Sequence, residues 1–150
     1  MKKIICLLLA IISLFSLVGC NSTLSDEDIY NKAKEVAVEI KTYDKSGAGL
    51  ALGSGFVYSK DGQIVTNYHV IDEAYSAEVY VGETKYAVSS VLAYDKDIDI
   101  AVLKINASNL KTLTISDDEV NTGMTVYALG SSRGLTSTFS RGIVSEKPLE

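Results

Sequence analysis

Apolar positions along the chain change their spacing near residue 36, which separates a short helical stretch from a long strand-like one. The helical stretch, SDEDIYNKAKEVAVEI, begins with Ser25, a preferred helix cap, and carries acidic residues in its first turn. Ile29, Ala33 and Val36 then follow at helical spacing. We therefore expect one short N-terminal helix that begins just after Ser25.

The rest of the chain is predicted to form short strands separated by tight turns. From Val36 onward apolar and polar residues alternate, and turn signals such as the KDG of residues 60–62 interrupt the alternation. This spacing is typical of an antiparallel barrel or a sandwich, and the residues alone leave the two open. The expected strands are Val36–Thr42, Gly55–Ser59, Gln63–Thr66, Ala77–Val81, Tyr86–Ala93, Ile98–Ile105, Met124–Leu129 and Phe139–Val144.

The first twenty residues are typical of a targeting segment. Two lysines precede an apolar run from Ile4 to Val18, which is short for a membrane span. The run ends in LVGC, which resembles the bacterial lipobox, where a signal is cut before a cysteine that then carries a diacylglycerol. Residues 1–19 would be the lipoprotein signal peptide, Cys20 the lipidated residue, and residues 20–25 a tether. An uncleaved anchor and an ordinary secretory signal are the alternatives, and all three export the chain.

Composition limits the partners that this chain can have. With 47% hydrophobic residues, the 150-residue chain has enough apolar material for the core of one domain. Its formal net charge of −5 would repel a phosphate backbone, so a nucleic-acid partner is not expected. The glycine-rich stretch GAGLALGSGF lacks the lysine of a phosphate-binding loop, so nucleotide binding is not indicated either.

Two polar side chains stand out because of the apolar residues around them. His69 is the only histidine in the chain and comes shortly after the apolar strand at residues 63–66. Asp99 lies between Ile98 and Ile100, where a buried carboxylate would need a hydrogen-bond donor, and His69 is one candidate. The alternatives are an aspartate bonded to nearby backbone N–H groups and a purely structural histidine.

The same stretch also carries the alternating acids that can begin a calcium loop. Asp95, Asp97 and Asp99 have the required spacing. However, the position that needs glycine is Ile100, and the position that needs glutamate is Asn106. We therefore expect no metal site there.

Three sequence blocks, in their order along the chain, resemble the HtrA/Deg family of trypsin-like serine proteases. The blocks are GSGFVYSKDGQIVTNYHVI, DIAVLKI and YALGSSRGLTSTFSRGIVS, and the resemblance extends from Val36 to Ser145. It implies that His69 is a general base and that Asp99 orients it. It also implies an all-β fold of trypsin-like antiparallel barrels, with the first barrel complete, only the first hairpin of the second, and no cofactor.

The resemblance assigns no nucleophile within the 150 residues. In this family order the serine follows the aspartate, and no Gly-x-Ser-Gly-Gly occurs in the chain. Ser54 precedes His69, and Ser131 and Ser132 lie in a loop that departs from the family pattern. We therefore expect residues 26–150 to be a trypsin-like peptidase domain truncated before its catalytic serine, and the chain by itself to be inactive as a hydrolase.

Three functions of different classes follow from these observations. The first is the N-terminal part of an exported HtrA-like serine endopeptidase, anchored by lipidated Cys20 to the outer face of the cytoplasmic membrane. It would act on unfolded or misfolded proteins, and an oligomer is left open. The second is a non-catalytic binding or regulatory lipoprotein that uses the barrel as a scaffold. The third is an unrelated β-barrel lipoprotein with structural His69 and Asp99, which the joint motif disfavours. We prefer the first.

Overall fold

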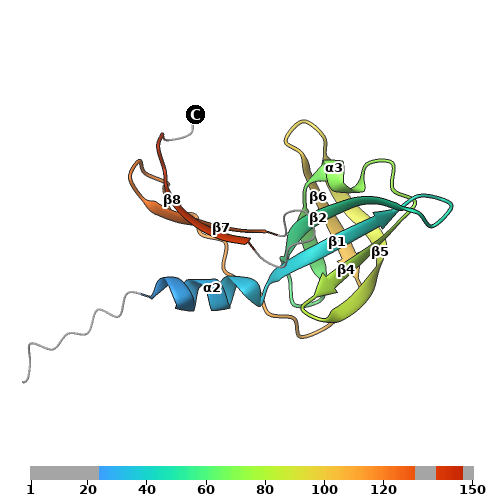
Figure 1. The fold of residues 1–150 in the computed structure, drawn as a ribbon, viewed down its shortest axis with the longest axis horizontal. Coiled ribbons are helices and arrows are strands. Elements are labelled where there is room, and N and C mark those ends of the chain that lie inside the picture. Colours follow the sequence, from blue (N-terminus) through green and yellow to red (C-terminus); the bar gives the residue numbers. More distant parts are fainter. Residues whose placement is uncertain (1–23, 131–137, 147–150) are drawn as a thin grey trace, which may run out of the picture.

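Six strands of the chain close into one antiparallel barrel (Figure 1) in the computed structural model, which describes residues 24–130 and 138–146. They are β1 (Ala37–Tyr43), β2 (Gly49–Val57), β3 (Gln63–Thr66), β4 (Ser76–Val81), β5 (Thr84–Asp95) and β6 (Ile100–Ile105). The strand order is β1-β2-β3-β6-β5-β4, and β4 pairs again with β1. This closure confirms the all-β class and decides for a barrel over a sandwich.

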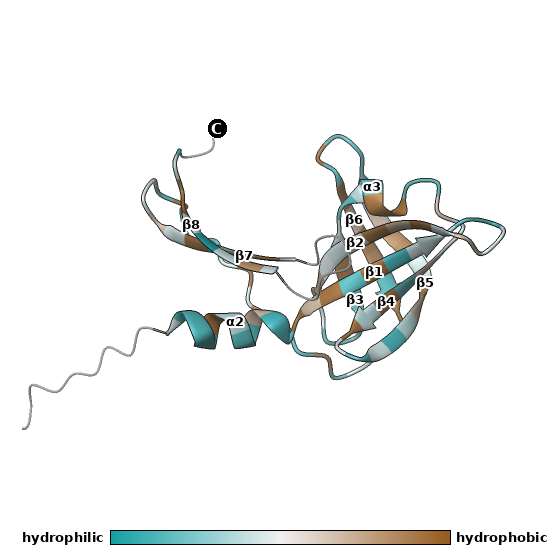
Figure 2. Cartoon of the chain, in the orientation of Figure 1, coloured by the Kyte–Doolittle hydropathy of each residue, from teal (hydrophilic) through white to brown (hydrophobic). Residues whose placement is uncertain are grey.

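The barrel core consists of apolar side chains that alternate along the strands. In β1, for example, Val38, Ile40 and Thr42 are buried, while the residues between them are partly exposed. Figure 2 shows apolar stretches along the barrel strands, in contrast to the mainly hydrophilic helix beside them. The buried apolar residues are Val36, Val38, Ile40, Val57, Ile64, Val70, Val79, Ala101, Leu103 and Ile105.

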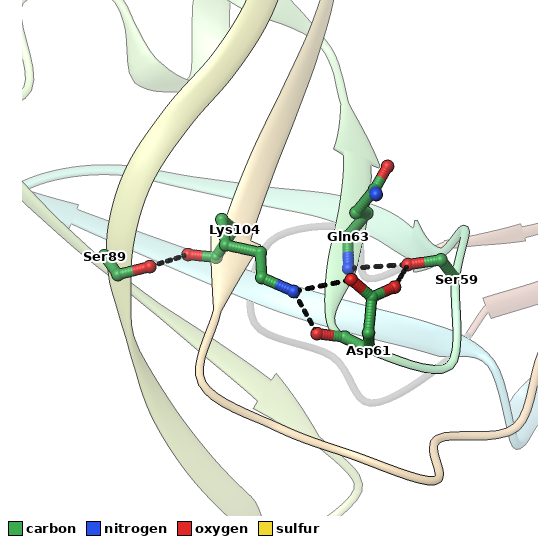
Figure 3. Close-up of polar contacts among 5 residues, drawn as sticks. All are labelled: Ser59, Asp61, Gln63, Ser89 and Lys104. Carbon is green, nitrogen blue, oxygen red and sulfur yellow. Dashed lines mark hydrogen bonds and ion pairs between the residues drawn. The ribbon is translucent and has the colours of Figure 1, made fainter.

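A polar network joins the turn between β2 and β3 to strand β6 (Figure 3). Lys104 pairs with the Asp61 carboxylate at 2.8 Å and also donates to the Asp61 carbonyl. Ser59 donates to the same carboxylate and accepts from the Gln63 backbone N–H at 3.1 Å, while Ser89 of β5 donates to the Lys104 carbonyl at 3.0 Å. The bond from Lys104, followed by that from Ser59, lowers the pKa of Asp61 to about 2.

A helix and a hairpin lie beside the barrel (Figure 1). Helix α2 (Asp26–Lys34) begins at the predicted cap, because the Ser25 hydroxyl accepts from the Asp28 N–H at 3.1 Å and the Asp28 carboxylate accepts from the Ser25 N–H at 3.1 Å. Strands β7 (Thr125–Gly130) and β8 (Thr138–Ile143) pair with each other in a two-stranded sheet. The predicted hairpin of a second barrel is therefore present.

Helix α2 packs against this hairpin through aromatic rings and two polar contacts. Tyr30 meets Phe139 edge-on with 5.3 Å between ring centroids, and Phe139 stacks on Tyr127 at 5.3 Å. The Asp26 carboxylate accepts from the Tyr127 hydroxyl at 2.6 Å and from the Arg141 guanidinium at 3.3 Å. The amino-acid pattern predicted both elements, but it contained no sign that they would meet.

Strand boundaries differ from the prediction chiefly where glycine or aspartate interrupts the pattern. β3 has the predicted bounds, whereas β2 begins at Gly49 rather than Gly55 because its glycine-rich half is extended and paired with β1. β6 begins at Ile100 rather than Ile98, since Asp99 adopts a left-handed backbone with φ of 54° that cannot continue an extended strand. The other strands shift by one or two residues at their ends.

Candidate active site

His69 lies on a one-turn helix, α3 (Tyr68–Ile71), that follows directly after β3. The sequence did not predict this helix, because four residues are too few to show a helical repeat. The next residue, Val70, points into the core and is only 4% exposed, whereas the His69 side chain is 70% exposed. The helix therefore fixes the histidine at the rim of the barrel with its ring accessible.

The close packing of α3 against β2 depends on glycines in the GSG stretch of β2. A Cβ atom at Gly53 would lie 2.5 and 2.6 Å from the two methyl groups of Val70, which is closer than carbon atoms can approach. At Gly55 a Cβ atom would lie 2.5 Å from the backbone carbonyl of Val65 in β3. Glycine inside a strand often marks such a close approach. These two residues therefore allow β2 to pack tightly against the segment that carries His69.

The Asp99 carboxylate contacts His69 at two points. Oδ2 lies 2.7 Å from ring nitrogen Nδ1, and Oδ1 accepts from the His69 backbone N–H at 2.9 Å. The backbone bond, followed by the ring contact, holds the pKa of Asp99 below its usual range, so the carboxylate is ionised at neutral pH. A carboxylate on Nδ1 favours the tautomer with the proton on that nitrogen, which leaves Nε2 as an acceptor. The contact with His69 that was considered for Asp99 is therefore present, and the same carboxylate also accepts from the His69 backbone N–H.

The expectation that Asp99 would be buried is wrong. Its side chain is 41% exposed, because the residue comes before β6 at the barrel rim. The flanking Ile98 and Ile100 are themselves 65% and 40% exposed, so they do not enclose the carboxylate. Hydrogen bonds rather than apolar surroundings therefore determine its position.

The neighbouring acids form a turn. The Asp95 carboxylate accepts from the backbone N–H groups of Asp97 and Ile98, at 2.9 and 3.3 Å. Among residues 24–130 and 138–146, no group of three or more His, Cys, Asp or Glu side chains is arranged to hold a metal ion.

Other residues singled out from the sequence are only partly covered by the structure. Ser54 is half-buried in β2, and its backbone carbonyl accepts from the Thr66 hydroxyl at 2.8 Å, which joins β2 to β3. Ser131, Ser132 and Cys20 lie outside the described residues. Within the described part of the chain, no helix is both long enough and apolar enough to span a bilayer.

Sequence reasoning missed the residues around the His69–Asp99 pair. The Asn67 side-chain amide donates to the Asp99 carbonyl at 3.0 Å, and the Tyr68 backbone N–H donates to the same oxygen at 3.2 Å. The Tyr68 ring packs against Tyr94 with 5.2 Å between centroids. The one available signal was the asparagine itself, because asparagine is favoured at the position before a helix.

Comparisons with known proteins identify relatives of this chain. Residues 53–149 match the family described as "Trypsin-like peptidase domain". The chain is 41% identical over 96 residues to a "Probable periplasmic serine endoprotease DegP-like" of Halomonas elongata, a match that covers 63% of this chain and 20% of that protein. It is 38% identical over 96 residues to "Protease Do-like 1, chloroplastic" of Arabidopsis thaliana, covering 62% of this chain and 22% of that protein.

A solved structure has the same arrangement of strands. The serine endoprotease from Yersinia pestis matches with a TM-score of 0.74 and 31% sequence identity, covering 84% of this chain and 46% of that one. The chain matches about a fifth of the length of the two curated relatives. Both His69 and Asp99 fall inside the residues that match the family, on the barrel that the solved structure shares. The chain therefore belongs to the trypsin-like peptidase domain family and is similar to its DegP-like endoproteases.

Proposed function

We propose that this chain provides the general base, His69, and the orienting acid, Asp99, of an HtrA/DegP-like serine endopeptidase. The observation that carries the proposal is the double contact of the Asp99 carboxylate with the ring and the backbone of His69. It holds Nδ1 of the ring, while the His69 side chain as a whole stays 70% exposed at the barrel rim. A histidine held in this way can take the proton of an attacking hydroxyl and return it to the leaving amine.

The substrates proposed are polypeptides, with unfolded or misfolded proteins as the preferred class. Support comes from the relatives, which are named as endoproteases and match this chain in both sequence and fold. An accessible base at the rim of a barrel is compatible with an extended peptide that lies across the surface.

The serine nucleophile is proposed to come from a longer form of the protein. The curated relatives extend well beyond the segment matched here. In a two-barrel protein, a Gly-x-Ser-Gly-Gly turn of the second barrel would face Nε2 of His69, and its N–H groups would stabilise the oxyanion. Residues 26–150 would then be a peptidase domain without its nucleophile.

A serine-directed phosphonate probe tests this proposal. The 150-residue chain should not be labelled, whereas the chain extended through its reading frame should be labelled at a serine that follows Asp99. His69→Ala and Asp99→Asn should each remove most of that labelling, since both lower the reactivity of the nucleophile. Labelling of Ser54, Ser131 or Ser132 in the 150-residue chain would contradict the proposal, as would an extended protein that reacts equally well without His69.

We further propose that the protein is exported and anchored through a lipid on Cys20. The LVGC stretch after an apolar run supports this, as does the periplasmic location in the name of the Halomonas elongata relative. More than one acyl chain would make the anchoring durable. Cys20→Ala should abolish labelling by a palmitate analogue and leave the precursor uncut, while Cys6→Ala should change neither result. Persistent lipid labelling of the Cys20→Ala protein would rule out this anchor.

A further inference from the structure

We propose that Asn67 is a positioning residue for the His69–Asp99 pair and that it acts through a reciprocal exchange of hydrogen bonds between the start of α3 and the start of β6. A role of Asn67 in catalysis rests on the proposed function, but the hydrogen bonds between the two segments can be tested without measuring catalysis. Asn67 contacts the Asp99 carbonyl, so its effect on the His69 ring must pass through Asp99.

The first half of the exchange is the hydrogen bond that Asn67, at the N-cap position of α3, donates to Asp99 instead of capping α3. Asn67 occupies the N-cap position of α3 with an extended backbone. Asparagine at this position usually accepts a hydrogen bond from a backbone N–H two or three residues later. In α3 the Asn67 side chain makes no such bond, and its amide instead donates to the Asp99 carbonyl at 3.0 Å.

The second half is the cap that Asp99 provides in return. The backbone N–H of His69, the second residue of α3, donates to Oδ1 of Asp99 at 2.9 Å. Each segment therefore satisfies a polar group of the other, as the two residues of a capping box do, although these partners are about thirty residues apart in sequence. The same carboxylate has one oxygen left, Oδ2, and this atom lies 2.7 Å from Nδ1 of the ring.

The backbone of Asp99 makes this exchange sensitive to the Asn67 amide. Asp99 has a φ of 54°, in the left-handed region that residues with a side chain adopt at a cost. Two donors hold its carbonyl in this conformation, the Asn67 amide at 3.0 Å and the Tyr68 N–H at 3.2 Å. Loss of the amide would leave only the Tyr68 N–H on this carbonyl and would favour a rotation of Asp99 toward an ordinary negative φ. That rotation would carry the carboxylate away from His69.

The single histidine of the chain offers a direct readout. The full chain, labelled with ¹⁵N at histidine and kept in detergent micelles, would be studied by NMR at about pH 8, where histidine is ordinarily neutral. In the unchanged protein we expect a ring with its proton on Nδ1. Asn67→Ala should shift the ring toward a mixture of tautomers. It should also speed solvent exchange of the His69 amide about tenfold, as expected for the loss of one hydrogen bond.

Two further variants separate positioning from stability. Asn67→Ser replaces one preferred cap with another, so the hydroxyl can cap α3 locally and keep the barrel folded while the bond to Asp99 is lost. It should therefore change the tautomer in the same way. Asn106→Ala removes an exposed asparagine at the other end of β6, and it should change neither the tautomer nor the exchange rate.

The outcomes distinguish this proposal from the proposed function. Unchanged ring signals in folded Asn67→Ser protein would overturn the exchange, whatever the enzymatic result. An extended protein that never reacts with the phosphonate probe would contradict the proposed function and leave the exchange standing. If both hold, Asn67→Ser in the extended protein should lower kcat while KM changes little, because the substrate contacts remain.

Discussion

The barrel and the β7–β8 hairpin are built from similar short strands, but their backbone N–H and C=O groups are paired to different extents. Each barrel strand has a neighbour on both sides, whereas β7 and β8 form a two-stranded sheet. Ile64 and Leu103 in the barrel are 0% exposed, while Val126 and Ile143 in the hairpin are 42% and 67% exposed. Closure removes the sheet edges and encloses a core, which two strands cannot do.

This difference shows that the two regions depend on different contacts. The hairpin is supported from outside by α2, chiefly through Tyr30 and Asp26. The His69–Asp99 pair belongs entirely to the barrel, because α3 follows β3 and Asp99 precedes β6, the strand next to β3. Changes in barrel packing should therefore disturb the pair, and changes in the hairpin should leave it intact.

The largest effect is expected from a cavity in the closed core. Ile64→Ala should lower the free energy of unfolding by about 2 to 5 kcal/mol, because the side chain is fully buried. The hairpin variant Val126→Ala should cost about 0.5 kcal/mol or less. Urea unfolding of both proteins measures the difference. Similar costs at the two sites would mean that the hairpin has a core of its own.

A smaller but more specific loss of stability is expected where α3 packs against β2. Gly53→Ala places a methyl group against Val70 and should cost about 1 to 3 kcal/mol of unfolding free energy. It should also shift α3 and weaken the bond between His69 and Asp99, which the NMR signal of the ring would report. Gly49→Ala is the matched control on the same strand, because a Cβ atom there would meet nothing within 4 Å. An unaltered ring signal in Gly53→Ala would show that α3 tolerates the added methyl.

The support of the hairpin by α2 should contribute still less. Tyr127→Phe removes the hydroxyl that donates to Asp26. It should lower the local stability of the hairpin by about 0.5 to 1.5 kcal/mol. Hydrogen exchange of the β7 and β8 amides should become faster while barrel amides and the His69 ring signal stay unchanged. Tyr75→Phe, at a tyrosine that is 68% exposed, is the control. A response of the barrel amides to Tyr127→Phe would mean that the two regions unfold together.

The smallest effect concerns the acid stability of the barrel. The pKa of Asp61 is lowered from 3.8 to about 2 in the folded state, and the hydrogen bond from Lys104 is the largest cause. A lowered folded-state pKa contributes stability above the unfolded value, and this stability is lost as the pH falls from about 4 toward 2. Asp61→Asn and Lys104→Met should each make the urea midpoint of unfolding depend less on pH in this range. The hairpin amides should show no such dependence on either residue, and a slope that neither substitution changes would contradict the assignment.

Local signals allowed much of the barrel to be predicted from sequence. The alternation in β1, the bounds of β3 and the cap at Ser25 depend on neighbouring residues, so a short window of sequence contains them. The pairing of His69 with Asp99 was suggested by residue type and motif order, and the 2.7 Å contact is present.

The features that sequence did not predict depend on distant parts of the chain. The glycine-rich start of β2 was not among the expected strands, because the close approach that requires glycine at Gly53 is to Val70, seventeen residues away in a different element. Asp99 was expected to be buried because its neighbours are apolar, but its place at the rim follows from where β6 begins. Contact between α2 and the hairpin joins residues about a hundred positions apart.

The pairing of β3 with β6 has a consequence for the order in which the protein assembles. Thr66 pairs with Ala101, directly beside the segments that hold Asn67 and Asp99. A slip of one residue would turn every side chain of β3 to the opposite face. His69 and Asp99 can therefore meet only after two segments thirty residues apart have found their native alignment. Until these segments are aligned, the His69 ring has no carboxylate to orient it.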